Sequence, residues 1–240
     1  MLAIEINNLT KKFKEKKAIN SINLTIDEGE LFALLGTNGA GKTTTIKILS
    51  TLILPTSGKV KIAGLDIIKD RQEIKKILNV SPQETAIAPN LSVKENLEFM
   101  AGVYQIKNKE KKINELIEMF KLEEVLKQKA KTLSGGWQRR VSIAISLINE
   151  PKILFLDEPT LGLDVIARKE LWNIIKKLKG KITIILTTHY MEEAESLSDR
   201  IGIMSKGNLV DVGTSEELIN KSGTKNFEDA FIKIATGGEL

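Results

Sequence analysis

Short, mainly apolar runs recur along the chain and alternate with segments of helical periodicity. Four of them are typical of strands buried on both faces of a parallel sheet. These runs occupy residues 31–35, 77–80, 153–156 and 182–186. Before the last run, Leu171, Ile174, Ile175 and Leu178 follow the spacing of an amphipathic helix. Because strands that alternate with helices favour a parallel sheet, the pattern predicts an α/β fold.

Two parts of the chain depart from this alternation. Ile22, Leu24 and Ile26 alternate with polar residues, which predicts a half-buried strand near the N-terminus. Residues 92–148 carry almost no strand pattern, and the capping-box sequence Ser92-Val93-Lys94-Glu95 predicts the start of a helix there. We therefore expect an all-helical insertion in the α/β core, followed by short strands over residues 200–212.

Composition narrows the possible chemistry. The 240 residues include 36 Lys or Arg and 31 Asp or Glu, and the net charge of +5 is compatible with a phosphate ligand, an anionic membrane surface or a solvated basic face. The chain has no cysteine and a single histidine, His189, which excludes disulfides, cysteine nucleophiles and multi-histidine metal sites. No apolar stretch approaches the ~18–20 residues of a membrane span, and no signal-peptide pattern opens the sequence. We expect a soluble chain that depends on another chain for any membrane span.

One glycine-rich segment matches the P-loop pattern G-x-x-x-x-G-K-[ST]. It reads Gly36-Thr37-Asn38-Gly39-Ala40-Gly41-Lys42-Thr43 and lies between the first apolar run and a helix expected over residues 44–52. Glycines let the backbone curl so that its N–H groups point at phosphate oxygens, and the helix N-terminus adds partial positive charge. Lys42 supplies a point charge for the β- and γ-phosphates, and the Thr43 hydroxyl suits Mg²⁺. The segment therefore predicts a site for a nucleoside triphosphate with Mg²⁺.

Polar residues also follow the other apolar runs. Asp157 and Glu158 end one of them, where two adjacent carboxylates repel each other unless a cation lies nearby. In a P-loop protein, Asp157 takes the Walker B role of holding Mg²⁺. Glu158 points to the opposite face and is suited to polarise an attacking water as a general base. Since ligands bind at the carboxyl ends of strands in open α/β sheets, we expect Gly36, Gln83, Asp157 and His189 to share one crevice.

A second glycine pair lies in Leu133-Ser134-Gly135-Gly136-Trp137-Gln138, directly before the apolar segment 141–148. Ser-Gly-Gly at a helix start exposes N–H groups and a hydroxyl, which is another anion-binding geometry. Arg139 and Arg140 add positive charge nearby. Because the P-loop already cradles the phosphates, a second phosphate-type loop favours a second chain that completes the site.

These motifs together resemble those of the ATP-binding subunits of ABC transporters, in the same order and over residues 4–236. Residues 36–43 resemble the family's Walker A motif, Gln83 its Q-loop and residues 133–138 its signature motif. Asp157 and Glu158 resemble the Walker B pair, Leu163-Asp164 the D-loop and His189 the switch histidine. Phe13 lies where the family has an aromatic that stacks on adenine. Trp137 is a departure, since the family more often has a polar or flexible residue there.

The resemblance implies a P-loop NTPase core with a parallel sheet, an N-terminal antiparallel β subdomain and an all-helical insertion. The core would comprise residues 1–85 and 150–215, the helical subdomain residues 86–149 and a short C-terminal helical tail residues 216–240. Glu158 and His189 are the implied catalytic residues, and Thr43, Gln83 and Asp157 the implied Mg²⁺ ligands. The implied ATP-binding residues are Phe13, Gly36, Thr37, Asn38, Gly39, Ala40, Gly41, Lys42, Thr43, Thr44, Ser134, Gly135, Gly136, Gln138 and Asp164.

Partners follow from the same resemblance. Two subunits, identical or related, would pack head to tail so that each ATP lies between Lys42 of one chain and Ser134 of the other. The pair would act on a separate polytopic membrane permease, with the chain cytoplasmic and peripheral on the inner face of the cell membrane, and without nucleic acid. His189-Tyr190-Met191-Glu192-Glu193-Ala194-Glu195 and the tail Phe227-Glu228-Asp229-Ala230-Phe231 resemble the branch that works with export permeases.

Two alternatives stay open at this point. One is a soluble ABC ATPase that acts as an assembly scaffold without a permease. The other is a P-loop kinase or GTPase. A GTPase carries an Asn-Lys-x-Asp motif that reads the base, and the nearest stretch here, Asn220-Lys221-Ser222-Gly223, lacks the Asp. A kinase has no use for a separate Ser-Gly-Gly loop.

Overall fold

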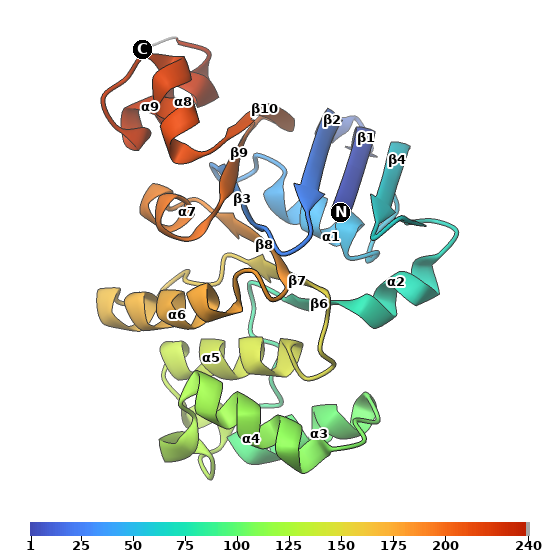
Figure 1. Ribbon diagram of the computed structural model, residues 1–240, viewed down its shortest axis with the longest axis vertical. Coiled ribbons are helices and arrows are strands. Elements are labelled where there is room, and N and C mark those ends of the chain that lie inside the picture. The colour runs from blue at the N-terminus through green and yellow to red at the C-terminus, as the bar shows by residue number, and fades with distance from the viewer. Residues whose placement is uncertain (239–240) are drawn as a thin grey trace.

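The computed structural model describes residues 1–238 and contains a central, mostly parallel sheet beside an antiparallel one (Figure 1). Within those residues the central sheet has the order β10-β9-β3-β8-β7-β6. Its strands are β3 (Leu31–Gly36), β6 (Leu78–Ser81), β7 (Ile153–Asp157), β8 (Thr183–Thr188), β9 (Arg200–Ser205) and β10 (Asn208–Gly213). The ladders from β6 to β9 are parallel, and β10 pairs antiparallel with β9. The predicted α/β class is confirmed.

The apolar runs became strands because helices cover both faces of the central sheet. Every residue of β3, β7 and β8 is buried. The prediction ended the β8 run at residue 186, but the strand continues through Thr187 and Thr188, which pair with Leu34 and Leu35 of β3. Their backbone groups complete the ladder although their side chains are polar, and this extension brings two hydroxyls to the carboxyl edge of the sheet.

The antiparallel sheet lies beside helix α1 (Lys42–Leu49) and has the order β2-β1-β4-β5 within the described chain. Its strands are β1 (Leu2–Phe13), β2 (Lys16–Asp27), β4 (Ser57–Ile62) and β5 (Leu65–Asp66). Apolar residues from this sheet, from α1 and from one face of β3 form one buried cluster, which includes Ile4, Ile46 and Phe32. The predicted N-terminal antiparallel β part is therefore confirmed, and α1 is packed between the two sheets (Figure 1).

From residue 93 to 146 the named elements are helices, joined by turns and with one isolated bridge between Lys129 and Ser92, and they lie at the end of the molecule remote from the antiparallel sheet (Figure 1). They are α3 (Val93–Val103), α4 (Lys109–Phe120) and α5 (Gly135–Ser146), with short 3₁₀ turns at Glu123–Val125 and Ala130–Thr132. The capping box at Ser92 and Glu95 is present as predicted. The helix start predicted at the Ser-Gly-Gly sequence is confirmed, because Ser134 is the N-cap of α5 and the glycine pair forms its first turn.

The remaining helices flank the central sheet. They are α2 (Arg71–Ile77), α6 (Val165–Leu178), α7 (Met191–Leu197), α8 (Ser215–Ser222) and α9 (Phe227–Thr236). The helix predicted over residues 44–52 is α1, which starts two residues earlier, directly after Gly41, and ends at Leu49. Among the described residues, no helix has both the length and the apolar character that crossing a bilayer requires.

Candidate active site

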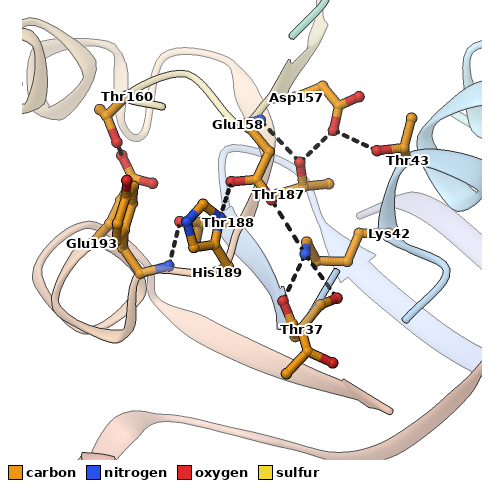
Figure 2. A network of polar contacts seen from close by, with 12 residues as sticks. Thr37, Lys42, Thr43, Asp157, Glu158, Thr160, Thr187, Thr188, His189 and Glu193 are labelled. Atoms are coloured by element: carbon orange, nitrogen blue, oxygen red, sulfur yellow. Dashed lines mark hydrogen bonds and ion pairs between the residues drawn. The ribbon is translucent and has the colours of Figure 1, made fainter. Parts of the chain in front are cut away.

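A cleft of about 540 Å³ opens where β3 and α1 meet the carboxyl ends of β7 and β8. Residues from distant parts of the sequence line it, and several of them appear in Figure 2. The lining residues are Phe13, Lys16, Ala18, Asn38, Gly39, Ala40, Gly41, Lys42, Thr43, Thr44, Gln83, Glu158, Leu161 and His189. Of the four residues expected in one crevice, Gln83 and His189 line the cleft together with residues 38–43 of the glycine-rich segment, whereas Gly36 and Asp157 are not among its lining residues in the described chain.

The glycine-rich segment turns tightly between β3 and α1 because side chains have no room at two positions. A Cβ at Gly36 would lie 2.4 Å from the Met204 carbonyl oxygen. Gly41 has a φ of +109°, and a Cβ there would lie 2.6 Å from the Ala18 oxygen. Since α1 starts at Lys42, free N–H groups of its first turn face the cleft. This geometry favours an anion at the helix N-terminus.

Lys42 and Glu158 form a buried ion pair at the base of the cleft (Figure 2). The Lys42 Nζ lies 3.2 Å from Glu158 Oε1 and donates to the carbonyl oxygen of Gly36 at 2.6 Å. The other carboxylate oxygen, Glu158 Oε2, lies 2.8 Å from His189 Nδ1. Glu158 therefore connects the cation of the glycine-rich segment with the histidine after β8.

Glu158 has the left-handed backbone conformation, with a φ of +48°, which is rare for a residue with a side chain. Thr187 holds it there. The Glu158 N–H donates to the Thr187 carbonyl oxygen at 3.1 Å and lies 3.0 Å from the Thr187 hydroxyl. This turn aims the Glu158 carboxylate into the cleft, away from the neighbouring Asp157.

Asp157 accepts two hydroxyl hydrogen bonds on one oxygen (Figure 2). Thr43 donates to Asp157 Oδ1 at 3.2 Å, and Thr187 donates to it at 2.5 Å. A hydroxyl and a carboxylate oxygen are the hard donors that Mg²⁺ accepts, and Mg²⁺ commonly needs only one or two protein carboxylates besides phosphate and water. No cluster of three or more His, Cys, Asp or Glu suited to a metal occurs in residues 1–238, so the donor set fits a phosphate-bound Mg²⁺ better than an all-protein metal site.

Gln83 is exposed and lines the cleft, and Arg139 of α5 fixes its backbone. The Arg139 guanidinium donates to the carbonyl oxygens of Pro82 at 2.7 Å and Gln83 at 2.6 Å. Burial lowers the pKa of Arg139, while the negative charges of Asp157 and Glu193 raise it. Arg139 therefore joins the helical region to the loop that carries Gln83, which the sequence had suggested only as positive charge near the Ser-Gly-Gly turn.

The Ser-Gly-Gly turn is not among the residues that line the cleft of the described chain. Ser134 is the N-cap of α5 without a side-chain capping bond, and a Cβ at Gly136 would lie 3.2 Å from the Cβ of Ala167 in α6. The Gln138 amide donates to the carbonyl oxygens of Ala130 and Leu133. Asp164 caps α6, since its side chain accepts from two backbone N–H groups at 2.9 Å.

Comparison with known proteins decides the family. A family model described as ABC transporter matches residues 19–161. The chain belongs to the ABC transporter family. It is 36% identical over 92% of its length to the daunorubicin resistance ATP-binding protein DrrA3 of Streptomyces coeruleorubidus, of which it covers 71%. It is 41% identical over 92% of its length to human phospholipid-transporting ATPase ABCA3, of which it spans 13%.

A solved structure agrees with this assignment. A dimeric ATP-binding cassette in a post-hydrolysis state, bound to ADP and Pi, matches with a TM-score of 0.78 and 30% identity over 88% of this chain and 98% of that one. The chain therefore has the fold of ABC ATP-binding cassettes, and the kinase and GTPase alternatives no longer apply. In family terms the glycine-rich segment is its Walker A motif and β7 ends in its Walker B motif.

The structure adds residues to this ABC subunit's site that the sequence did not indicate. Thr187 binds both Asp157 and the Glu158 backbone, and Lys16, Ala18 and Leu161 line the cleft. A pair of threonines directly after an apolar run was the available signal for Thr187. Lys16 and Ala18 had no signal, because the tertiary fold brings β2 beside the Walker A segment, where a Cβ on Gly41 would lie 2.6 Å from the Ala18 carbonyl oxygen.

Proposed function

We propose that the chain hydrolyses ATP between two ABC subunits and drives export through a separate membrane-spanning permease. The observation that carries the catalytic part is the contact of Glu158 with both Lys42 and His189 in one cleft. The adjoining contact between Thr43 and Asp157 supports Mg²⁺ as cofactor. Lys42, the N–H groups of residues 36–44 and the exposed Phe13 ring would hold the triphosphate and the adenine.

Each polar side chain then has a distinct task. Thr43 and Asp157 would hold Mg²⁺, with Gln83 as a further oxygen ligand, and the ion would neutralise charge on the phosphates. Lys42 stabilises negative charge on the β- and γ-phosphates. Glu158 accepts a proton from the attacking water as general base. His189 orients the Glu158 carboxylate, since their side chains are 2.8 Å apart, and contacts the γ-phosphate.

A second copy of the chain completes the site in this proposal. Ser134, Gly135, Gly136, Gln138 and Asp164 stand outside the cleft of their own chain. The Ser-Gly-Gly turn is of a phosphate-binding type but has no phosphate site beside it in its own chain, so it is suited to contact a nucleotide that another subunit holds. The similar cassette with ADP and Pi is dimeric. We therefore propose a head-to-tail homodimer in which Ser134 of one copy faces the Walker A segment of the other.

Transport rests on the family and on the relatives' names. DrrA3 is named for daunorubicin resistance, which supports export. We propose that residues 86–149 form a helical subdomain that contacts the permease, and that the chain lies on the inner face of the cell membrane. Residues 1–85 and 150–215 would form the ATP-binding core. The helical tail was expected over residues 216–240, of which 239–240 lie outside the described residues. Affinity purification of the tagged chain from membranes tests this: a polytopic membrane protein should copurify, whereas its absence would favour the scaffold alternative.

Two variants test nucleotide binding. Lys42→Ala should weaken ATP binding in calorimetry, because it removes the buried cation of the cleft. Lys47→Ala is the matched control, since Lys47 is exposed in the last turn of the same helix. Undiminished ATP affinity of Lys42→Ala would contradict the proposed site.

A further inference from the structure

Glu193 is a fully buried carboxyl that has no part in the proposed chemistry. It lies on α7 with 0% of its surface exposed. One of its oxygens, Oε1, accepts from the Thr160 hydroxyl at 2.8 Å and from the Trp172 indole N–H at 3.0 Å. Burying a carboxyl in a protein is costly unless other groups satisfy it, so these contacts need an explanation.

The bond from Glu193 to Thr160 joins the two segments that carry the catalytic pair. Thr160 follows Glu158 by two residues, and Glu193 follows His189 by four. Figure 2 shows this bond beside the contact between Glu158 and His189. Each segment leaves a different strand of the sheet, β7 or β8. The strands are paired up to Asp157 and Thr187, and beyond that point the Thr187 bonds to the Glu158 N–H, the contact of Glu158 with His189 and the bond of Thr160 with Glu193 join the two segments.

The surroundings of Glu193 favour one fixed arrangement. Burial raises the pKa of its carboxyl and the charge of Glu158 raises it further, while the hydrogen bonds from Thr160 and Trp172 lower it. Thr160 is also fully buried, with 0% exposure. When one partner of a buried hydrogen bond is removed, the other group has neither a partner nor water, and its full desolvation penalty destabilises the protein. The bond between Thr160 and Glu193 therefore holds both segments tightly.

We propose that Glu193 is a positioning residue that, through Thr160, fixes the turn after Glu158 against the helix after His189. Glu158 has an unfavourable backbone conformation, and a turn that relaxes would move its carboxylate away from His189 and from the attacking water. Displacement of a catalytic group by about 1 Å can lower the rate about 100-fold. This inference rests on the proposed roles of Glu158 and His189.

The two hydrogen bonds of Glu193 allow a matched test. Its bond to Thr160 connects the catalytic segments, whereas its bond to Trp172 connects α7 to α6, outside the cleft. Thr160→Val removes the first bond with almost no change of shape, and Trp172→Phe removes the second. If Glu193 has only a structural role, both variants should lose activity in proportion to the decrease in their melting temperatures. A positioning role predicts that only Thr160→Val loses it.

Steady-state ATP hydrolysis by the purified full chain measures the difference. We expect Thr160→Val to lower kcat at least tenfold with KM within twofold of the unchanged chain, because ATP binding does not depend on this bond. Thr160→Ser, which keeps the hydroxyl, and Trp172→Phe should stay within threefold in kcat. Glu193→Gln, which keeps an acceptor oxygen, should retain activity, and Glu193→Leu should lose it as Thr160→Val does.

Several results would overturn the proposal. They are a kcat of Thr160→Val within threefold of the unchanged chain, an equal loss in Trp172→Phe, or failure of Thr160→Ser to retain activity. If Glu193→Leu does not fold, the Thr160→Val variant alone decides. The folding of Thr160→Val is then verified by its melting temperature and by Trp172 emission in a Trp137→Phe background. Undiminished hydrolysis by Glu158→Gln would refute the proposed function as well, whereas a normal Thr160→Val with an inactive Glu158→Gln refutes this inference only.

Discussion

The ion pair between Lys42 and Glu158 predicts that Glu158→Gln raises the affinity for the nucleotide and lowers the rate of ATP hydrolysis. The Lys42 ammonium lies 3.2 Å from the Glu158 carboxylate, and both side chains are almost buried, with 6% and 7% exposure. The phosphates of ATP compete with Glu158 for this cation. We therefore expect Glu158→Gln to bind a non-hydrolysable ATP analogue more tightly while it hydrolyses ATP far more slowly.

The size of the effect follows from the bond that is given up. A hydrogen bond to a charged group contributes about 1.5–3 kcal/mol net. A glutamine still accepts a bond from Lys42, so the lower figure of about 1.5 kcal/mol applies. Since each 1.4 kcal/mol changes an equilibrium constant tenfold, the Kd should fall about tenfold. Removal of a negative charge beside the incoming phosphates acts in the same direction.

Calorimetry with the analogue and Mg²⁺ measures this change. Each variant also carries Ser134→Arg, so that pairing of two chains does not contribute to the affinity. Glu30→Gln is the matched control: the Glu30 side chain is 8% exposed, pairs with Arg200 at 2.8 Å and is not among the residues that line the cleft. An analogue Kd of Glu158→Gln that equals or exceeds that of Glu30→Gln would refute the competition argument.

Three further predictions address separate parts of the molecule. Ser134→Arg alone should leave ATP binding by calorimetry unchanged and abolish phosphate release, and retained turnover would show that the Ser-Gly-Gly turn does not complete the site. Phe13→Ala should weaken ATP binding without changing the affinity for inorganic tripolyphosphate, because the 49% exposed ring is proposed to contact only the base; equal losses for both ligands would contradict this. Phe120→Ala, which empties a fully buried position among the helices of residues 93–146, should lower the free energy of unfolding in urea by about 3–5 kcal/mol. A loss below 1 kcal/mol would mean that this part of the core repacks.

Local sequence carried enough information to place the Walker A segment and the strands that lead to it. The P-loop pattern specifies its own turn, because glycines are required where backbone atoms approach closely, as Gly36 approaches Met204. Buried parallel strands are short and apolar, so β3 and β7 were visible as uninterrupted runs. The shared cleft of Gln83 and His189 beside the Walker A segment then followed from parallel topology alone, whereas Gly36 and Asp157, which were expected there too, are not among the residues that line it.

Elements without a strong apolar period were not predicted. In β4 only Val60 and Ile62 are buried, and its other residues face solvent. Helix α2 buries only Ile74 and has no side-chain cap at Asp70. In both cases the sequence pattern is too short to show a period, and the neighbouring elements supply the stabilisation. The hydrogen bond from Arg139 to the Gln83 carbonyl oxygen could not be predicted either, because the two residues are 56 positions apart in the sequence.

The geometry of Glu158 and His189, the proposed catalytic pair, depends on contacts that no motif describes. The left-handed conformation of Glu158 costs on the order of 1–3 kcal/mol and persists only where other contacts hold it. Thr187, at the end of β8, accepts a hydrogen bond from the Glu158 N–H, and Glu193 of α7 accepts one from the Thr160 hydroxyl. Neither contact can be inferred from spacing, since each requires that β7 and β8 already lie side by side. The sequence therefore identifies the groups that we propose to react, while Thr187, Thr160 and the buried Glu193 hold the segments that carry those groups.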